Sequence, residues 1–167
     1  MEIAARHSPR GVLSTDRSES LTAALTPSEK KEIEAGFGTF WKSVTGAEVK
    51  RSAKCYPELP FIYKTKHGIL KGQIDLVFRD SKREWVILDY KTNRFSSAAE
   101  KDALVEGYRW QLGLYALAFW KLYGQIPART LLYFSHSQEV TETRWSGKEL
   151  ERLENELETL YRAAVSA

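Results

Sequence analysis

The chain has 167 residues, of which 43% are hydrophobic and 28% are charged, a balance that suits one domain over residues 1–167 and excludes global disorder. Its net charge of +3 is compatible with nucleic acid binding but does not require it, because dedicated binders usually concentrate their charge on one face. The single cysteine, Cys55, excludes an intrachain disulfide, a zinc cluster and an iron–sulfur cluster. No apolar run approaches the ~18 residues of a membrane span, and the N-terminus lacks the apolar core of a signal peptide, so we expect a cytoplasmic protein with no membrane partner.

The first half of the chain predicts a loop, a helix and four strands. Residues 1–25 are expected to be partly flexible, because most of them are serine, threonine, glycine or charged residues. Thr26, Pro27 and Glu29 form a capping-box signature with proline at the first helical position, and they predict a helix that runs to about Val44. Four extended segments with tight connections then predict an antiparallel meander. The segments are 48–55, 58–65, 68–79 and 84–91, joined at Pro57, 66–68 and 80–84.

The second half predicts a long helix, two strands and a closing helix. From about Ala98 the apolar spacing becomes three or four residues, which predicts a helix of roughly 25 residues that ends before Gly124. Ser146 and Glu149 form a second capping box and start the closing helix. The two strands are expected at 128–136 and 138–145. The sequence therefore predicts an α/β domain with a mixed central β-sheet, an antiparallel meander followed by further strands, flanked by helices.

Two neighbouring apolar strands each contain an aspartate, which is costly to bury unless something pairs with it. In a hairpin closed by a five-residue turn, Val77 pairs with Ile87, and Asp75 then lies opposite Asp89 with Cβ atoms ~5 Å apart. Lys91 lies two residues beyond Asp89 and therefore faces the same side of the sheet. Like charges this close must share a proton or a cation.

A divalent cation between the two aspartates would explain this arrangement. Mg²⁺ commonly binds one or two carboxylates and keeps several waters and a substrate phosphate, and a lysine beside it would position or activate water or stabilise phosphate charge. This combination predicts metal-assisted hydrolysis of a phosphodiester. The alternative is a surface ion pair between Asp89 and Lys91, worth ~0–1 kcal/mol, with Asp75 at an exposed strand end. The apolar flanks of both strands argue against it, and Gly72 leaves room for a close approach.

The segments "GQID" and "ILDYKT" resemble motifs of the PD-(D/E)XK nuclease superfamily, in the form found in the RecB/AddA-like nuclease domains of bacterial helicase–nucleases. In "YRWQLGLYALAF", Gln111 and Tyr115 match the Q-x-x-x-Y motif of that branch, and "PELPF" resembles the segment that precedes the first acid. The resemblance spans roughly residues 48–145, which would form the catalytic core. It implies a restriction-endonuclease-like fold.

The resemblance also implies a metal site. Asp75 and Asp89 would bind Mg²⁺ or Mn²⁺, the backbone carbonyl of Tyr90 would add a ligand, and Lys91 would act with the two acids in catalysis. Family members usually carry a metal-binding histidine on an N-terminal helix, and His7 is the candidate for it in this chain. The alternative for His7 is an exposed residue near a terminus.

Three further residues are implied to contact DNA or to support the site. Gln111 and Tyr115 lie four residues apart and therefore share one face of the long helix. The alternative is that this face only packs on the sheet, although a glutamine in a core needs a polar partner. Glu58, in the segment before the first acid, is the third of these residues.

The resemblance implies a Mg²⁺-dependent nuclease of the exodeoxyribonuclease type that acts on DNA, in particular on single-stranded ends. Residues 1–167 would be the nuclease module of a larger ATP-dependent helicase–nuclease in double-strand break repair and recombination, with the helicase motor and a partner subunit outside this chain. The single cysteine favours the branch without an iron–sulfur cluster. Two alternatives stay open: a catalytically weak nuclease-fold module that serves DNA binding or subunit docking, and a structural α/β domain with accidental motif matches.

Overall fold

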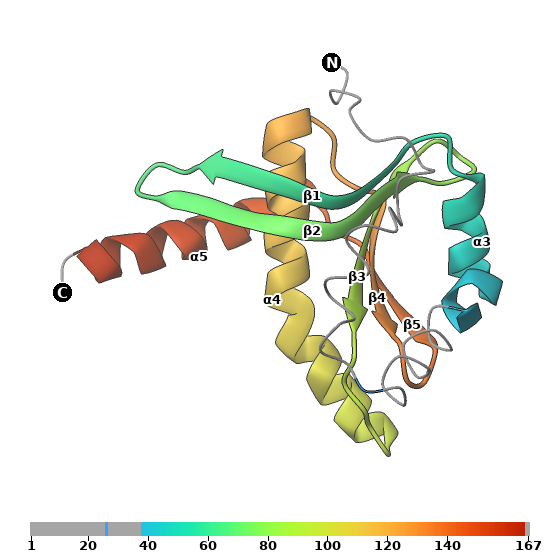
Figure 1. Ribbon diagram of the computed structural model, residues 1–167. Coiled ribbons are helices and arrows are strands. Elements are labelled where there is room, and N and C mark those ends of the chain that lie inside the picture. The colour runs from blue at the N-terminus through green and yellow to red at the C-terminus, as the bar shows by residue number, and fades with distance from the viewer. Residues whose placement is uncertain (1–25, 27–37, 166–167) are drawn as a thin grey trace.

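The computed structural model describes Thr26 and residues 38–165, which form one five-stranded sheet with helices against it. The strands lie in the order β1-β2-β3-β4-β5, and only β3 and β4 are parallel neighbours (Figure 1). The strands are β1 (Cys55–Lys64), β2 (Ile69–Arg79), β3 (Trp85–Lys91), β4 (Arg129–Phe134) and β5 (Glu139–Thr143), and the helices are α3 (Val44–Arg51), α4 (Ala98–Tyr123) and α5 (Gly147–Val165). The predicted α/β class with a mixed sheet is confirmed. No helix within the described ranges combines the length and apolar character that crossing a membrane requires.

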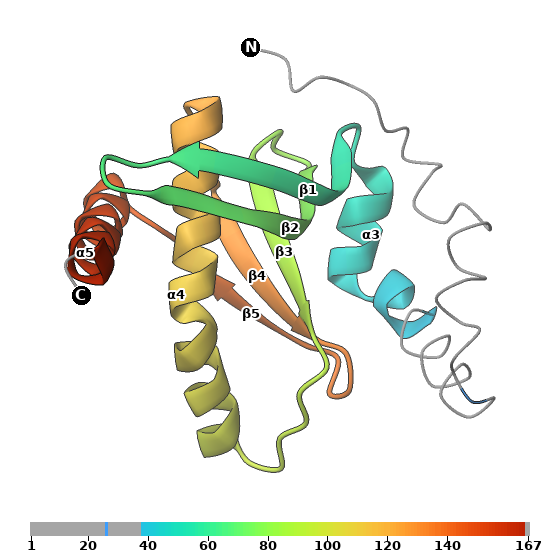
Figure 2. The ribbon, with the colours of Figure 1, turned by 60° about the vertical axis from the view of Figure 1, so that its left-hand side comes forward.

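The two faces of the sheet carry separate hydrophobic cores. Alternate residues of β3 point to opposite faces, and β3 is buried on both because it lies between β2 and β4. Val86 and Leu88 pack on the face covered by α3, whereas Ile87 packs on the face covered by α4 (Figure 2). Asp89 and Lys91 continue the alternation of Ile87 and therefore face α4.

Helix α4 is the crossover that joins the parallel strands β3 and β4, as parallel neighbours require. The hydroxyl of Ser97 caps its start by accepting a hydrogen bond from the Glu100 N–H. Its end is closed by Gly124, which has a left-handed backbone with φ of 72° and donates its N–H to the Trp120 carbonyl. The long helix that the sequence predicts, ending before Gly124, is confirmed.

The start of the described chain differs from the prediction. Residues 38–42 are helical, but the helix breaks at Ser43, whose hydroxyl accepts the Gly46 N–H and caps the separate helix α3. The predicted strand at 48–55 is therefore wrong for 48–51, which lie in α3. Thr26 is exposed and belongs to no helix or strand, and residues 27–37 of the predicted helix lie outside the described part.

The predicted break at Pro57 is also wrong. Pro57 lies inside β1 and pairs with Leu76 of β2. Because β1 is an edge strand, a residue without an N–H costs it no hydrogen bond on its open side. The register of the next hairpin is as predicted, since Val77 pairs with Ile87 and the Asp80 N–H donates to Glu84 across the turn.

The end of the chain follows the prediction closely. The Ser146 N–H and hydroxyl both donate to the Glu149 carboxylate, at 2.8 and 2.7 Å, and the Glu149 N–H donates back to the hydroxyl at 3.3 Å. This is the capping box that the sequence predicts at the start of α5.

Candidate active site

The site residues of β3 are its last three, where the strand leaves the sheet opposite α4. Asp89 is almost fully buried, with 2% of its side chain exposed, and Lys91 is 13% exposed. Lys91 Nζ lies 2.7 Å from Asp89 Oδ2, so the two form an ion pair inside the protein rather than on its surface. The surface ion pair considered as an alternative is therefore excluded.

A chain of hydrogen bonds continues from Lys91 into α4. Lys91 Nζ donates to Gln111 Oε1 at 2.9 Å, and Gln111 Nε2 donates to the Tyr115 hydroxyl at 2.8 Å. The face of α4 that carries the Q-x-x-x-Y pair thus contacts the catalytic lysine predicted on β3, and it does more than pack on the sheet. The Tyr115 ring also packs edge-on against Phe61 of β1, with centroids 5.9 Å apart, which holds this helix face against the sheet.

Asp75 reaches the same place from β2. Pairing between β2 and β3 ends at Leu76 and Leu88, and beyond that point the Tyr90 N–H donates to Asp75 Oδ2 at 2.9 Å. A side chain thus takes the bond that a further rung of the sheet would have made. The Asp75 carboxylate therefore lies against the peptide that directly follows Asp89, as the predicted register requires.

The electrostatics of the pair favour a bound cation. Burial raises the pKa of Asp89, the hydrogen bond and charge of Lys91 lower it, and the negative charge of Asp75 raises it further, so the net shift is upward. Asp89 Oδ2 is buried and receives no well-aligned hydrogen bond, although Lys91 partly balances its charge. Oxygen ligands from two carboxylates are what Mg²⁺ and Mn²⁺ prefer, so these residues fit such an ion.

The remaining predicted ligands have different positions. The Tyr90 side chain points away from the site into the α3 face, where it packs edge-on against Phe40 and Tyr133, so only its backbone borders the two acids. His7 lies outside the described residues. Within Thr26 and 38–165, no three histidine, cysteine, aspartate or glutamate side chains converge on a metal position. A metal at Asp75 and Asp89 would complete its shell with backbone, water or phosphate oxygens, or with His7.

Glu58 lies across β1 from Asp75. Pro57 pairs with Leu76 and Leu59 with Ile74, so Glu58 is the residue between them that stands opposite Asp75. Its backbone has φ of 49°, a left-handed conformation that is uncommon for residues other than glycine, and its side chain is exposed. The structure thus brings Glu58 next to the acid end of the site, although its register pair is the one missing from an otherwise continuous ladder.

Sequence reasoning missed Tyr108. Lys91 Nζ lies 4.0 Å from the centre of the Tyr108 ring, and the Tyr108 hydroxyl donates to Asn93 at 2.8 Å. The ring therefore forms part of the wall around the ammonium group. The signal was present, because Tyr108 lies three residues before Gln111 and so shares its helix face.

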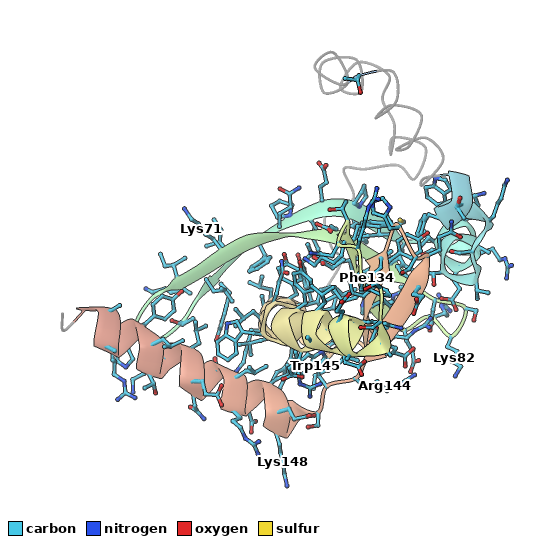
Figure 3. The ribbon with its side chains drawn as sticks, turned by 90° about the horizontal axis from the view of Figure 1, so that it is seen from below. Lys71, Lys82, Phe134, Arg144, Trp145 and Lys148 are labelled. Atoms are coloured by element: carbon cyan, nitrogen blue, oxygen red, sulfur yellow. The ribbon has the colours of Figure 1, made fainter. Side chains whose placement is uncertain are left out.

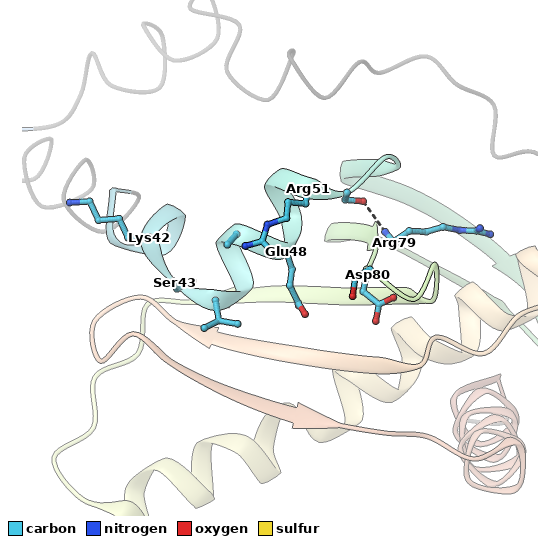
Figure 4. Close-up of a pocket in the computed structure, with 10 residues that line it drawn as sticks. Lys42, Ser43, Glu48, Arg51, Arg79 and Asp80 are labelled. Atoms are coloured by element: carbon cyan, nitrogen blue, oxygen red, sulfur yellow. Dashed lines mark hydrogen bonds between the residues drawn. The ribbon is translucent and has the colours of Figure 1, made fainter.

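A separate hollow of about 360 Å³ lies between α3 and the β2–β3 turn (Figure 4). It contains none of the predicted site residues. Its acids are held by Arg129, which contacts Glu48 at 2.8 Å and Asp80 at 3.5 Å. The carboxylates of this hollow therefore already have a cation, unlike the Asp75 and Asp89 pair, and the chemistry favours the end of β3.

Comparison with known proteins adds a family and a fold. A profile described as the PD-(D/E)XK nuclease superfamily matches residues 2–167. An ATP-dependent helicase/nuclease from Clostridium kluyveri is 28% identical over 126 residues, and one from Ligilactobacillus salivarius is 37% identical over 67 residues. These matches cover 65% and 40% of this chain but 10% and 5% of those proteins, so the chain spans a tenth or less of their length. A crystal structure from Eubacterium rectale, described as a candidate exonuclease, shares the fold with a TM-score of 0.59 at 12% identity, covering 90% of this chain and 59% of that one.

Proposed function

Because the chain belongs to the PD-(D/E)XK nuclease superfamily, we propose that it is a metal-dependent deoxyribonuclease that hydrolyses DNA phosphodiesters at the end of β3. The observation that carries this proposal is the meeting of two strands at one peptide. Asp75 accepts the N–H of Tyr90, the residue after Asp89, while Lys91 joins Asp89 to Gln111.

In this proposal the two acids and the Tyr90 carbonyl hold Mg²⁺ or Mn²⁺, which supplies a Lewis acid for the phosphate and a water of lowered pKa. Lys91 is held between Asp89 and Gln111, and its remaining ammonium proton is free to bind a phosphate oxygen or the attacking water. Burial of Asp89 keeps bulk water from its carboxylate, which strengthens every charge interaction at this position.

Gln111, Tyr115 and Tyr108 act as positioning residues. Gln111 uses its carbonyl oxygen toward Lys91 and its amide nitrogen toward Tyr115, so the tyrosine hydroxyl fixes which way the amide faces. The Tyr108 ring limits the other directions open to the ammonium group. Together they hold Lys91 in one orientation before substrate arrives, which is how a preorganised site lowers a reaction barrier.

The whole protein's role is a further part of the proposal. The relatives are named as parts of an ATP-dependent helicase/nuclease, and the chain matches a tenth or less of their length. We therefore infer that residues 1–167 are an exonuclease-type module of a larger helicase–nuclease. It would act on single-stranded DNA ends in double-strand break repair and recombination, beside a helicase motor and a partner subunit.

The test is cleavage of end-labelled single-stranded DNA by the full chain with Mg²⁺, with Mn²⁺ and with EDTA. Asp89→Ala and Lys91→Ala should each lower the rate at least ~100-fold while circular dichroism and the Tm show a folded protein. Lys82→Ala is the matched control, because Lys82 is exposed in the β2–β3 turn. Equal cleavage by wild type and both site variants would contradict the proposal.

DNA binding without efficient cleavage is the second candidate. It is favoured by the small ligand set, since the described residues supply only two converging carboxylates. A calorimetric titration separates the two functions. Absent Mn²⁺ binding combined with salt-sensitive DNA binding would favour the second candidate.

A further inference from the structure

Strands β1 and β2 continue past the sheet as a two-stranded arm, made of residues 58–64 and 69–75 (Figure 1). Strand β3 does not pair with this part of β2, because its pairing begins at Leu76. An isolated pair of strands is marginally stable in water, so the arm needs support from another element.

Helix α5 supplies that support at the tip. The Tyr161 hydroxyl donates to the Ile69 carbonyl at 2.8 Å, and the Tyr63 hydroxyl donates to Glu154. Glu158 accepts the N–H groups of Lys66 and His67 at 2.6 and 3.0 Å. These contacts hold one face of the arm against the helices, so its other face is a fixed surface.

The outer face of the arm combines lysines with exposed isoleucines. Side chains alternate along each strand, and Ile62 pairs with Lys71 while Lys64 pairs with Ile69. Ile62 is 70% exposed and Ile69 is 59% exposed, which is unusual for side chains this large. Figure 3 shows Lys71 pointing away from α4 and α5. Neither lysine forms an ion pair within the described part of the chain.

This outer face leads to the candidate active site. Positions 69, 71 and 73 lie on it, and the same alternation brings Asp75 to its inner end. Ile74 and Val77 both pack toward α4 although they are three residues apart, so β2 rotates at Asp75 and turns the outer face toward the end of β3. Lys71 lies four residues from Asp75, ~13 Å along an extended strand.

We propose that the outer face of the arm binds the single strand of DNA that extends from the active site, an inference that rests on the proposed nuclease function. Lys64 and Lys71 bind phosphates, and Ile62 and Ile69 contact the faces of unstacked bases. A single strand fits better than a duplex, because a duplex hides its base faces and presents mainly phosphates to a surface that is half apolar. The charge pattern agrees, since the acids near this face, Glu58 and Asp75, lie at its metal-binding end.

The lysines are tested by DNA binding without cleavage. The full chain is titrated against a fluorescent 20-mer of thymidine in EDTA over a salt series, and anisotropy reports Kd. The double variant Lys64→Gln, Lys71→Gln should bind roughly tenfold more weakly, and its slope of log Kd against log salt should fall by ~1.4, the value for two single-strand phosphate contacts. The control pair Lys82→Gln, Lys148→Gln makes the same charge change at exposed sites off the arm (Figure 3), and should stay within about twofold of wild type.

The isoleucines have their own readout. Ile62→Ser with Ile69→Ser should weaken single-strand binding several-fold and leave the salt slope unchanged, because no phosphate contact is lost. Both isoleucines are exposed, so the Tm of this variant should stay near that of wild type.

The outcomes separate the arm from the nuclease. If the lysine variant binds like its control, the arm proposal is overturned, and the isoleucines belong to a contact with protein. Tighter binding of duplex than of single strand by wild type would also overturn it. Arm-dependent binding by a protein that never cleaves DNA would support the arm and contradict the nuclease, whereas cleavage with arm-independent binding would do the reverse.

Discussion

Lys91 on β3 and Gln111 on α4 are joined by a hydrogen bond of 2.9 Å from Nζ to Oε1, across 20 residues of chain. The same ammonium group pairs with Asp89 at 2.7 Å, so one lysine receives its orientation from both a strand and a helix. The position of α4 against the sheet therefore sets the geometry of the predicted catalytic group.

Replacing Gln111 should lower catalysis more than substrate binding. Gln111→Met keeps the length of the side chain but removes the acceptor for Lys91, so we expect kcat to fall roughly 10- to 100-fold, with a smaller change in KM. Tyr115→Phe removes only the group that orients the amide and should have a weaker effect in the same direction. The measurement is steady-state cleavage of single-stranded DNA. A fall in Tm that fully accounts for the lost activity would contradict a positioning role.

Neutralising Asp89 should stabilise the protein without metal. Its carboxylate is 2% exposed, and burial disfavours its charge. Asp89→Asn keeps the shape and removes the charge, so the Tm in EDTA should rise. Added Mn²⁺ should raise the Tm of wild type and have little effect on this variant, because ligands that bind only the folded state stabilise it.

A matched control for this thermal-shift experiment is Asp102→Asn, a change at an exposed carboxylate on α4. This control should respond to Mn²⁺ as wild type does. An equal metal-dependent shift in all three proteins would place the metal away from Asp89.

The acid pair was predictable because few physical choices were open. A five-residue turn and strands buried on both faces allow one register, which places Asp75 opposite Asp89. The Gln111 and Tyr115 face followed from helical spacing alone. That the face turns toward Lys91 did not follow, since it depends on how α4 docks on the sheet.

The N-terminal elements were harder to predict for a local reason. Val44, Thr45 and Val49 are β-branched and favour extended structure, yet they form a short helix because Ser43 caps it and Val49 is buried in the core. The left-handed backbone of Glu58 is likewise invisible in sequence, because turn signals attach to glycine and asparagine rather than glutamate.

Acid should loosen the arm through Glu154 on α5. Burial by itself raises the pKa of Glu154, but the hydrogen bonds from Lys121 and Tyr63 lower it by more, so its pKa lies below the usual 4.5. A carboxyl whose pKa is lowered on folding stabilises the fold above its unfolded pKa, and this contribution is lost as pH falls through the folded value. Glu154→Gln should therefore lower the Tm at neutral pH and reduce the loss of Tm on acidification below pH 4.5.

Thermal denaturation followed by circular dichroism from about pH 3 to 7 measures this contribution. Glu156→Gln, at an exposed position of the same helix, is the control and should keep the acid dependence of wild type. Parallel acid dependence in the Glu154 variant and this control would exclude a role for Glu154.

Two glycines in helices should respond oppositely to the same substitution. A Cβ at Gly107 in α4 would meet nothing within 4 Å, so Gly107→Ala should stabilise the protein by about 0.5–1 kcal/mol through helix propensity. A Cβ at Gly46 in α3 would lie 2.1 Å from the Phe40 carbonyl oxygen, a backbone atom that cannot move independently.

Gly46→Ala should therefore lose stability despite the same gain in propensity, on the order of 1–3 kcal/mol, because α3 must shift away from the turn that Ser43 closes. Phe40 is 2% exposed and lies in the core of the α3 face, so the shift also disturbs that core. Urea denaturation of both variants gives the two free energies of unfolding. A stabilised Gly46→Ala would mean that the break at Ser43 relaxes easily and that α3 is not held in place by this close contact.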